Sequence, residues 1–245
     1  MSTPLISVIT AHAGNPLLKR CVESVRDQTY TNIQHLVVSD GPATWGHARA
    51  VLDAVGNHHV SLIPLPYSIG KDRWNGHRIY GACTYIADGD YLVFLDDDNF
   101  IEPEHVQQCL KICTEGNVWS YALRNIVDSE HRFLCRDDCE SLGKWPSVLH
   151  PEDFFVDVNC YFLPKLLAVQ VSPLWYRKAR EPGQPEVDRA IAHALRQIAP
   201  NHDCTYAYSV NYLAGNTPLS VQPEFFTRGN AEMLRRFNGR LPWAR

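Results

Sequence analysis

Apolar segments of strand length alternate with segments of helical periodicity over the first hundred residues, and this alternation limits the possible folds more than any other feature. The strand-like segments are residues 5–10, 33–40, 60–66 and 91–98, and the helix-like segments between them are 16–28, 43–55 and 74–87. Strands that alternate with helices are typical of right-handed crossovers and a parallel sheet. Because strands such as YLVFL are apolar at successive positions, both faces of the sheet should be covered. We therefore predict an α/β fold with a doubly wound, mostly parallel central sheet.

The pattern changes after residue 100, where strand-like and helix-like segments no longer alternate. The expected strands are 118–128, 132–138, 154–163 and 204–213, and the expected helices are 103–116, 185–199 and 231–237. No flexible linker separates the two patterns. We therefore predict a single domain over residues 1–245, with a first half of residues 1–100 and a second half, residues 101–245, in which the sheet is mixed.

Composition excludes several classes of protein. A net charge of −4 gives no basic field for nucleic acid. The eight cysteines include no CxxC pair, and the opening MSTPLISVIT lacks a signal-peptide pattern, which together predict a cytoplasmic protein with reduced thiols. No apolar run approaches the roughly 18 residues of a transmembrane helix. Arginines in residues 225–245 leave a peripheral position at the inner face of the membrane as an alternative.

Three consecutive aspartates, Asp96–Asp98, follow the apolar run YLVFL. Adjacent carboxylates repel one another unless a cation lies among them or they project in different directions. Mg²⁺ and Mn²⁺ bind carboxylate oxygens and often share a site with phosphate oxygens. The alternative is that these residues form a turn and cap ahead of the helix at 103–116. Because Asp40 also ends a predicted parallel strand, both acidic positions should open onto the same edge of the sheet, where ligands bind in such folds.

Two segments resemble the family 2 glycosyltransferases of the GT-A fold. They are LISVITAHAGNPLLKRCVESVRDQTYTNIQHLVVSDGP, residues 5–42, and YSIGKDRWNGHRIYGACTYIADGDYLVFLDDDN, residues 67–99. The resemblance covers residues 5–105 and implies an inverting enzyme. Such an enzyme moves a sugar from a nucleotide-diphosphate sugar to an acceptor hydroxyl with the help of Mn²⁺ or Mg²⁺. It also implies a nucleotide-binding first half, an acceptor-binding second half and a role in polysaccharide or glycoconjugate biosynthesis.

The expected partners also follow from this resemblance. UDP is the expected nucleotide of the donor, and the acceptor is a sugar or a glycoconjugate, with a lipid-linked acceptor among the alternatives. The chain has neither a QxxRW-like element nor a membrane-length apolar run, so we predict a non-processive enzyme. Neither the donor sugar nor the oligomeric state follows from the sequence.

The resemblance assigns the donor site to matching positions. Thr10 and Ala11 correspond to residues whose backbone meets the nucleotide, Asp40 to an aspartate that accepts a hydrogen bond from the base, and Arg78 to a basic residue near the diphosphate. The loop after the first strand reads TAHAGNP where the family has PTYNR, which leaves the base contacts of that loop open.

The acidic cluster corresponds to the DxD element of the family. Asp96 and Asp98 match its outer residues, and both are predicted metal ligands, with Asp98 as the principal one. The triple aspartate leaves open whether Asp96 or Asp97 faces the donor sugar.

The catalytic base of such an enzyme takes the proton of the acceptor hydroxyl. The segment GQPEVDRAIAHALRQ resembles the acidic element that carries this base, which gives Asp188, with Glu186 as second choice. Acidic residues in a first helical turn also complement the helix dipole, so this pattern alone does not decide. Asp153 and Asp157 in PEDFFVDVNCYFLPK are competitors for the role.

Two other functions remain open. A nucleotidyltransferase would need a glycine-rich phosphate loop after the first strand, and AHAGNPLLKR has one glycine. A catalytically inactive nucleotide-sugar-binding protein could keep the same fold, although intact acidic residues at 40 and 96–98 favour an enzyme.

Overall fold

The structure is a computed structural model that describes residues 3–56, 59–72, 74–149, 152, 154–177, 187–216 and 220–244. Its strands are β1 Ile6–His12, β2 Ile33–Ser39, β3 Val60–Pro64, β4 Tyr91–Asp96, β5 Phe100–Ile101, β6 Trp119–Val127, β7 Phe133–Arg136, β8 Tyr161–Pro164 and β9 His202–Leu213. Its helices are α1 Leu18–Arg26, α2 Pro42–Val55, α3 His77–Ile86, α4 His105–Thr114, α5 Lys165–Val171, α6 Val187–Ile198 and α7 Pro223–Arg236, with 3-10 turns η1 Val158–Cys160 and η2 Ser172–Tyr176.

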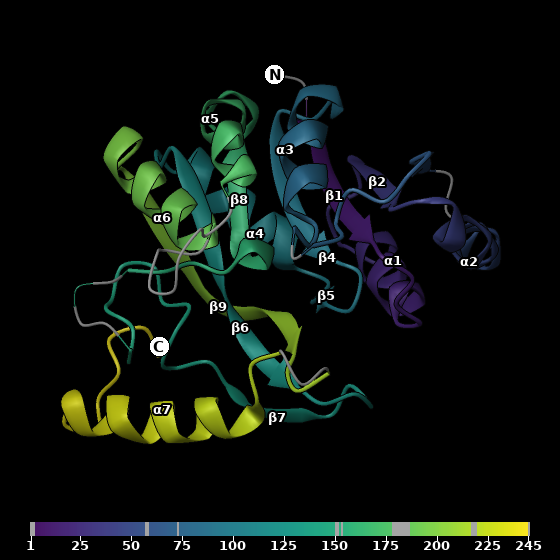
Figure 1. The fold of residues 1–245 in the computed structure, drawn as a ribbon. Helices are drawn as coiled ribbons and strands as arrows, with labels where there is room; N and C mark the ends of the chain where they lie inside the picture. Colours follow the sequence, from purple (N-terminus) through teal and green to yellow (C-terminus); the bar gives the residue numbers. More distant parts are fainter. Residues whose placement is uncertain are drawn as a thin grey trace.

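One sheet runs through both predicted halves of the chain (Figure 1). In the described residues it has nine strands in the order β3-β2-β1-β4-β8-β6-β9-β5, and β7 pairs with β6. Strands β1 to β4 are mutually parallel where they pair. The second half is mixed, because β8 is antiparallel to both β4 and β6, whereas β9 runs parallel to β6. The predicted α/β fold with a mostly parallel first half is confirmed.

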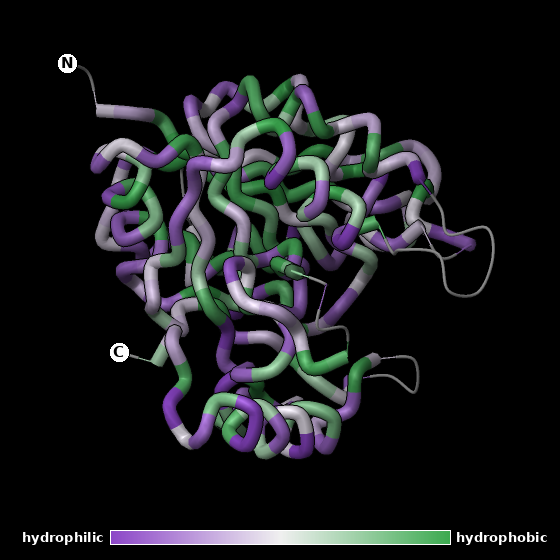
Figure 2. The backbone as a smooth tube through the Cα atoms, turned by 90° about the vertical axis from the view of Figure 1, so that its left-hand side faces the viewer, coloured by the Kyte–Doolittle hydropathy of each residue, from purple (hydrophilic) through white to green (hydrophobic). Residues whose placement is uncertain are grey.

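Helices cover both faces of the parallel strands. Helices α1 and α2 lie on one side, where Val37 of β2 packs with Leu18 and Ala48. Helix α3 lies on the other side, where Tyr80 packs edge-on against Phe94 of β4 (Figure 1). Burial on both faces explains why these strands are apolar at successive positions. Figure 2 shows the same distribution, with hydrophobic residues concentrated in the strands that cross the interior.

The second half departs from the expected elements in four places. The strand predicted at 154–163 begins only at Tyr161, because Asp157 accepts a hydrogen bond from the Asn159 backbone N–H (3.0 Å) and caps the turn η1. Helix α5 and the short strand β5 were not expected, since α5 follows β8 without a loop and β5 has two residues. Helix α7 begins at Pro223, well before the expected residue 231.

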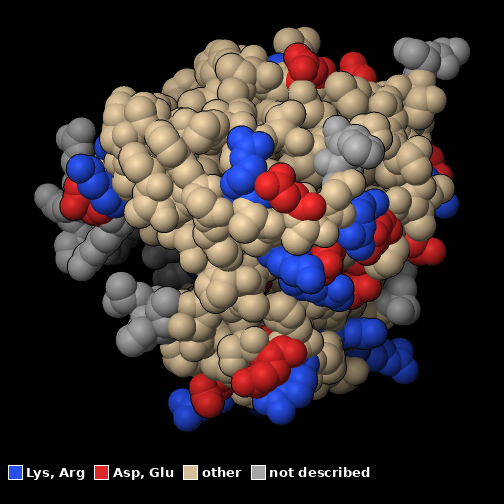
Figure 3. All heavy atoms as spheres, turned by 90° about the vertical axis from the view of Figure 1, so that its right-hand side faces the viewer, with Lys and Arg blue, Asp and Glu red and all other residues tan. Residues whose placement is uncertain are grey.

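The surface gives limited information about partners. On the side shown in Figure 3, Lys and Arg side chains are interspersed with Asp and Glu. Among the helices in the described ranges, none has the combination of length and apolar composition that crossing a membrane requires.

Candidate active site

A cavity of about 570 Å³ opens where β1, β2 and β4 end. This is the edge of an open parallel sheet at which ligands bind. Its lining residues come from the three strand ends, the segment before α3 and the end of β9: Ala11, His12, Ala13, Asp40, Gly70, Asn75, Gly76, Ile79, Asp96, Asp97, Asp98, Asn99, Tyr212, Leu213, Asn216 and Ser220. The fold therefore brings together the predicted residues Ala11, Asp40 and Asp96–Asp98, which are far apart in sequence.

The carboxylate of Asp40 closes a turn in the wall of this cavity. It accepts hydrogen bonds from the Ser68 hydroxyl (2.8 Å) and from the backbone N–H groups of Ile69 (2.6 Å) and Gly70 (3.0 Å). A Cβ atom on Gly70 would lie 2.6 Å from the Asn75 carbonyl oxygen and 2.8 Å from Asp40 Oδ2, so glycine is required there. Asp40 thus shapes the cavity as well as lining it.

Asp96 is held on two sides by buried donors. The Tyr80 hydroxyl donates to Asp96 Oδ1, and the Asn159 carboxamide donates to Asp96 Oδ2 (2.9 Å). Burial raises the pKa of Asp96 to about 6. The carboxylate is therefore fixed in orientation before any ligand binds.

Asp97 points away from Asp96 toward the end of β1. Its Oδ2 lies 2.6 Å from Nδ1 of the buried His12 and accepts a hydrogen bond from the Ala13 backbone N–H (3.1 Å). Nε2 of His12 lies in turn 3.1 Å from Nδ1 of His47 on α2. The three adjacent carboxylates thus project in different directions, which was one of the two arrangements expected from the sequence.

Among the described residues, Asp98 has fewer hydrogen-bond partners than Asp96 or Asp97. Its Oδ2 accepts a hydrogen bond from the Asn216 carboxamide (2.6 Å). Burial, followed by the nearby charges of Asp96 and Asp97, raises the pKa of Asp98 to about 8. A bound cation would reverse this effect, because positive charge favours the ionised carboxylate. The chemistry of Asp98 thus fits a hard divalent ion.

Asp98 and Asp96 are the residues that would hold a metal ion at this position. Within the part of the chain that the structure describes, no group of three His, Cys, Asp or Glu side chains is arranged to hold a metal ion. A divalent cation held by Asp98 and Asp96 could also bind water and phosphate oxygens, as Mg²⁺ does in nucleotide sites.

The predicted competitor Asp157 belongs to a buried ionic cluster outside the cavity lining. Arg124 of β6, 1% exposed, donates from Nε to Asp137 (2.7 Å), from Nη1 to Asp157 (2.6 Å) and from Nη2 to Glu140 (2.6 Å). The guanidinium explains why a carboxylate lies in this apolar segment, since buried charges require partners. Arg189 extends the cluster by donating to Glu140 (3.2 Å).

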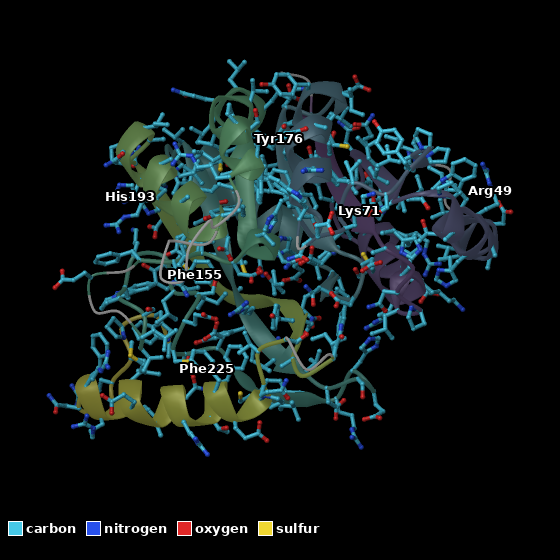
Figure 4. All side chains as sticks on the ribbon, viewed as in Figure 1. Arg49, Lys71, Phe155, Tyr176, His193 and Phe225 are labelled. Carbon is cyan, nitrogen blue, oxygen red and sulfur yellow. The ribbon has the colours of Figure 1, made fainter. Side chains whose placement is uncertain are left out.

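Asp188 lies in the first turn of α6, half-buried, as the helix pattern predicted. Its Oδ1 accepts a hydrogen bond from the Arg189 backbone N–H (2.9 Å), and it is not among the residues that line the cavity. The Arg189 guanidinium lies 4.5 Å above the ring of Phe155, which Figure 4 places between α6 and α7. Asp153 and Glu186 lie outside the described residues, so the identity of the base stays a prediction.

Two other residues that were predicted to bind the donor, Thr10 and Arg78, lie outside the cavity lining. The side chain of Thr10 is buried, its hydroxyl lies 2.9 Å from Nε2 of His35, and Thr10 is not among the lining residues. Arg78 stacks on Trp74 at 3.7 Å and donates to the Ile69 carbonyl oxygen (3.4 Å). Arg78 thus braces the turn that Asp40 closes, and it is not among the lining residues.

The residues that were not identified from sequence include His12, Tyr212 and Asn216 in the cavity lining and Asn159, which lies outside the lining and binds Asp96. His12 lies two residues after the first predicted strand segment, so its place at the sheet edge could have been predicted. The other three depend on how the second half joins the sheet.

The chain is similar to known proteins over its first half. The family model described as Glycosyl transferase family 2 matches residues 7–133, more than half of the chain. Putative glycosyltransferase EpsH of Bacillus subtilis (strain 168) is 29% identical over 113 residues, which are 45% of this chain and 31% of that protein. Chondroitin synthase of Escherichia coli is 30% identical over 108 residues, 44% of this chain and 15% of that protein. The chain therefore matches less than a third of the length of these relatives.

Solved structures support the fold over nearly the whole chain. S. aureus TarS 1-349 superposes with a TM-score of 0.63 at 14% identity, covering 95% of this chain and 71% of that one. The same protein in complex with UDP-GlcNAc gives a TM-score of 0.62 at 14% identity, covering 95% and 65% of the two chains. At such low identity the likeness concerns the fold, and it agrees with the GT-A-type sheet described above.

Proposed function

Because the chain belongs to glycosyl transferase family 2, we propose that it transfers a sugar from a nucleotide-diphosphate sugar to an acceptor hydroxyl. The observation that carries this proposal is the cavity at the ends of β1, β2 and β4, which gathers Asp40 and Asp96–Asp98 at one edge. UDP is the proposed nucleotide, because TarS, which shares the fold, has been solved in complex with UDP and with UDP-GlcNAc.

The donor would lie with its base toward Asp40 and its diphosphate toward the acidic cluster. Among the described residues, three groups donate hydrogen bonds to Asp40, and a carboxylate can accept about four, which supports a contact with the base. At the other end, Asp98 together with Asp96 would hold Mn²⁺ or Mg²⁺. When bound, the cation neutralises charge on the departing diphosphate.

Transfer would proceed by a single displacement with inversion at the anomeric carbon. A carboxylate must then take the proton from the acceptor hydroxyl, and Asp188 is the proposed base. The acceptor is a sugar or glycoconjugate, and a single sugar is added in each encounter. Intact acidic residues at 40 and 96–98 favour an enzyme over an inactive binding protein.

The test is UDP binding with and without Mn²⁺, measured by calorimetric titration. The parent protein should bind UDP more tightly when Mn²⁺ is present. Asp98→Ala should lose this difference while remaining folded, because the variant keeps the rest of the cavity. Glu115→Ala removes an exposed carboxylate at the end of α4 and should behave like the parent. Unchanged Mn²⁺-dependent binding in folded Asp98→Ala would mean that the cluster is a turn and that the metal-dependent function is wrong. Hydrolysis of the nucleotide sugar by the parent separates an enzyme from an inactive binding protein.

A further inference from the structure

We propose that Asn159 is a positioning residue that fixes the orientation of Asp96 and ties the donor cavity to the buried Arg124 cluster. This inference rests on the proposed function, because it gives Asp96 a place in the donor site. Asn159 is fully buried in η1, and its Oδ1 accepts a hydrogen bond from the Asp96 backbone N–H (2.7 Å). Its Nδ2 donates to Asp96 Oδ2 (2.9 Å) and to Asp157 Oδ1 (2.9 Å).

Only a carboxamide fits this set of partners. The two N–H bonds of Asn159 face two carboxylates, and its oxygen faces a backbone N–H. The orientation of the amide is therefore fixed by its neighbours, since exchange of oxygen and nitrogen would place donor against donor. An aspartate of the same shape would set three carboxylates against one another, and an apolar residue would remove the acceptor of the Asp96 backbone N–H and the side-chain donor to Asp96 Oδ2.

Asp157, the second carboxylate that Asn159 binds, is itself held by buried hydrogen bonds. Asp157 binds Asn159 through Oδ1 and Arg124 through Oδ2. Arg124 is in turn bound by Asp137 and Glu140. A chain of buried, hydrogen-bonded groups thus runs from the core of the second half to a strand end in the first half.

Asp96 is held differently from the next two aspartates. Its Oδ1 is bound by Tyr80 of α3 and its Oδ2 by Asn159, so both oxygens have donors from the interior. The remaining lone pairs of the two Asp96 oxygens can then interact with a ligand in the cavity. Small displacements of such a group are costly, because a shift of about 1 Å in a binding or catalytic geometry can change rates by roughly 10²-fold. Asn159 therefore acts on the donor through Asp96.

The experiment is a double-mutant cycle on UDP affinity in the presence of Mn²⁺. Asn159→Asp should weaken binding by roughly tenfold or more, because hydrogen bonds to a charged group are lost. In the Asp96→Ala background, Asn159→Asp should weaken binding no further, because its effect passes through Asp96. A residue that merely supports the fold would lower affinity by the same factor in both backgrounds, and that result would overturn the proposal.

Asn211 of β9 provides the matched control. It is also a buried asparagine, 4% exposed, and its Nδ2 donates to a carboxylate, Glu102 Oε1 (2.8 Å), away from Asp96. Asn211→Asp should lower stability in a comparable way while leaving UDP affinity near that of the parent. If Asn159→Asp does not fold, Asn159→Ser adds no charge and carries the same cycle.

The outcomes separate this inference from the proposed function. Equal UDP affinity of the parent and Asp96→Ala would overturn the donor-site role of Asp96, and the positioning role with it. Loss of affinity in Asp96→Ala but not in folded Asn159→Asp or Asn159→Ser would overturn the positioning role alone.

Discussion

Asp40 closes a turn and is proposed to contact the base, and two measurements on Asp40→Ala test these roles separately. Asp40→Ala removes the acceptor of three hydrogen bonds, from the Ser68 hydroxyl and from the backbone N–H groups of Ile69 and Gly70. Hydrogen bonds to a charged group contribute roughly 1.5–3 kcal/mol each. Because Asp40 is half-buried and water can replace part of what is lost, we expect the free energy of unfolding to fall by about 2–4 kcal/mol in total.

The same change should weaken nucleotide binding if the carboxylate also meets the base. We expect UDP affinity to fall roughly tenfold, equivalent to about 1.4 kcal/mol, both with and without Mn²⁺, since β1 lies between the strand that ends at Asp40 and the strand that ends at the acidic cluster. Urea unfolding measures the first effect, and calorimetric titration with UDP, at a temperature where both proteins are folded, measures the second.

Ser68→Ala is the matched control. It removes one of the three hydrogen bonds and leaves the carboxylate in place, so it should cost about 1 kcal/mol of stability and bind UDP like the parent. An Asp40→Ala protein as stable as the parent would refute the role in the turn. A destabilised Asp40→Ala protein with the parent's UDP affinity would refute the contact with the base.

Two further predictions concern the base and the core. Asp188→Asn keeps size and hydrogen bonding but cannot accept a proton, so sugar transfer or donor hydrolysis should slow roughly 10²–10⁴-fold with donor affinity nearly unchanged. Normal turnover of Asp188→Asn beside an inactive Asp153→Asn would move the role to Asp153, and beside an Asp157→Asn that is inactive but keeps the UDP affinity of the parent it would move the role to Asp157. Burial lowers the pKa of His35 to about 3, below its value of 6.5 in the unfolded chain, so its contribution to stability is present above pH 6.5 and is lost as the pH falls toward 3. The loss is about 1.4 kcal/mol per pH unit. His35→Gln keeps a hydrogen-bond partner for Thr10 and should reduce the decline of the unfolding free energy between pH 6 and 4. The control His193→Gln changes an exposed histidine of α6 (Figure 4) and should follow the parent. Equal slopes for the parent and both variants would contradict a buried, neutral His35.

The first half of the fold was predictable because its signals are local. Strands buried on both faces are continuous apolar runs, and the topology of parallel strands alone places Asp40 and Asp96–Asp98 at one edge. The second half was less predictable, because a local cap by Asp157 replaced the start of the expected strand. The partners of the acidic cluster depend on pairings across the chain: Asn159 and Asp96 are 63 residues apart, and Asn216 and Asp98 are 118 apart. No local pattern indicates such contacts.

The position of β4 in the sheet has a consequence for biosynthesis. Its run YLVFL lies between β1, which precedes it, and β8, which is made only when residues 161–164 leave the ribosome. Until then, a growing chain has one unpaired edge on an apolar strand. Exposed edges of this kind pair readily with other chains. A truncated protein that ends near residue 133, where the family match stops, would keep that edge open permanently. Such a fragment should aggregate, and chaperone demand should be greatest while the ribosome translates the stretch from β4 to β8.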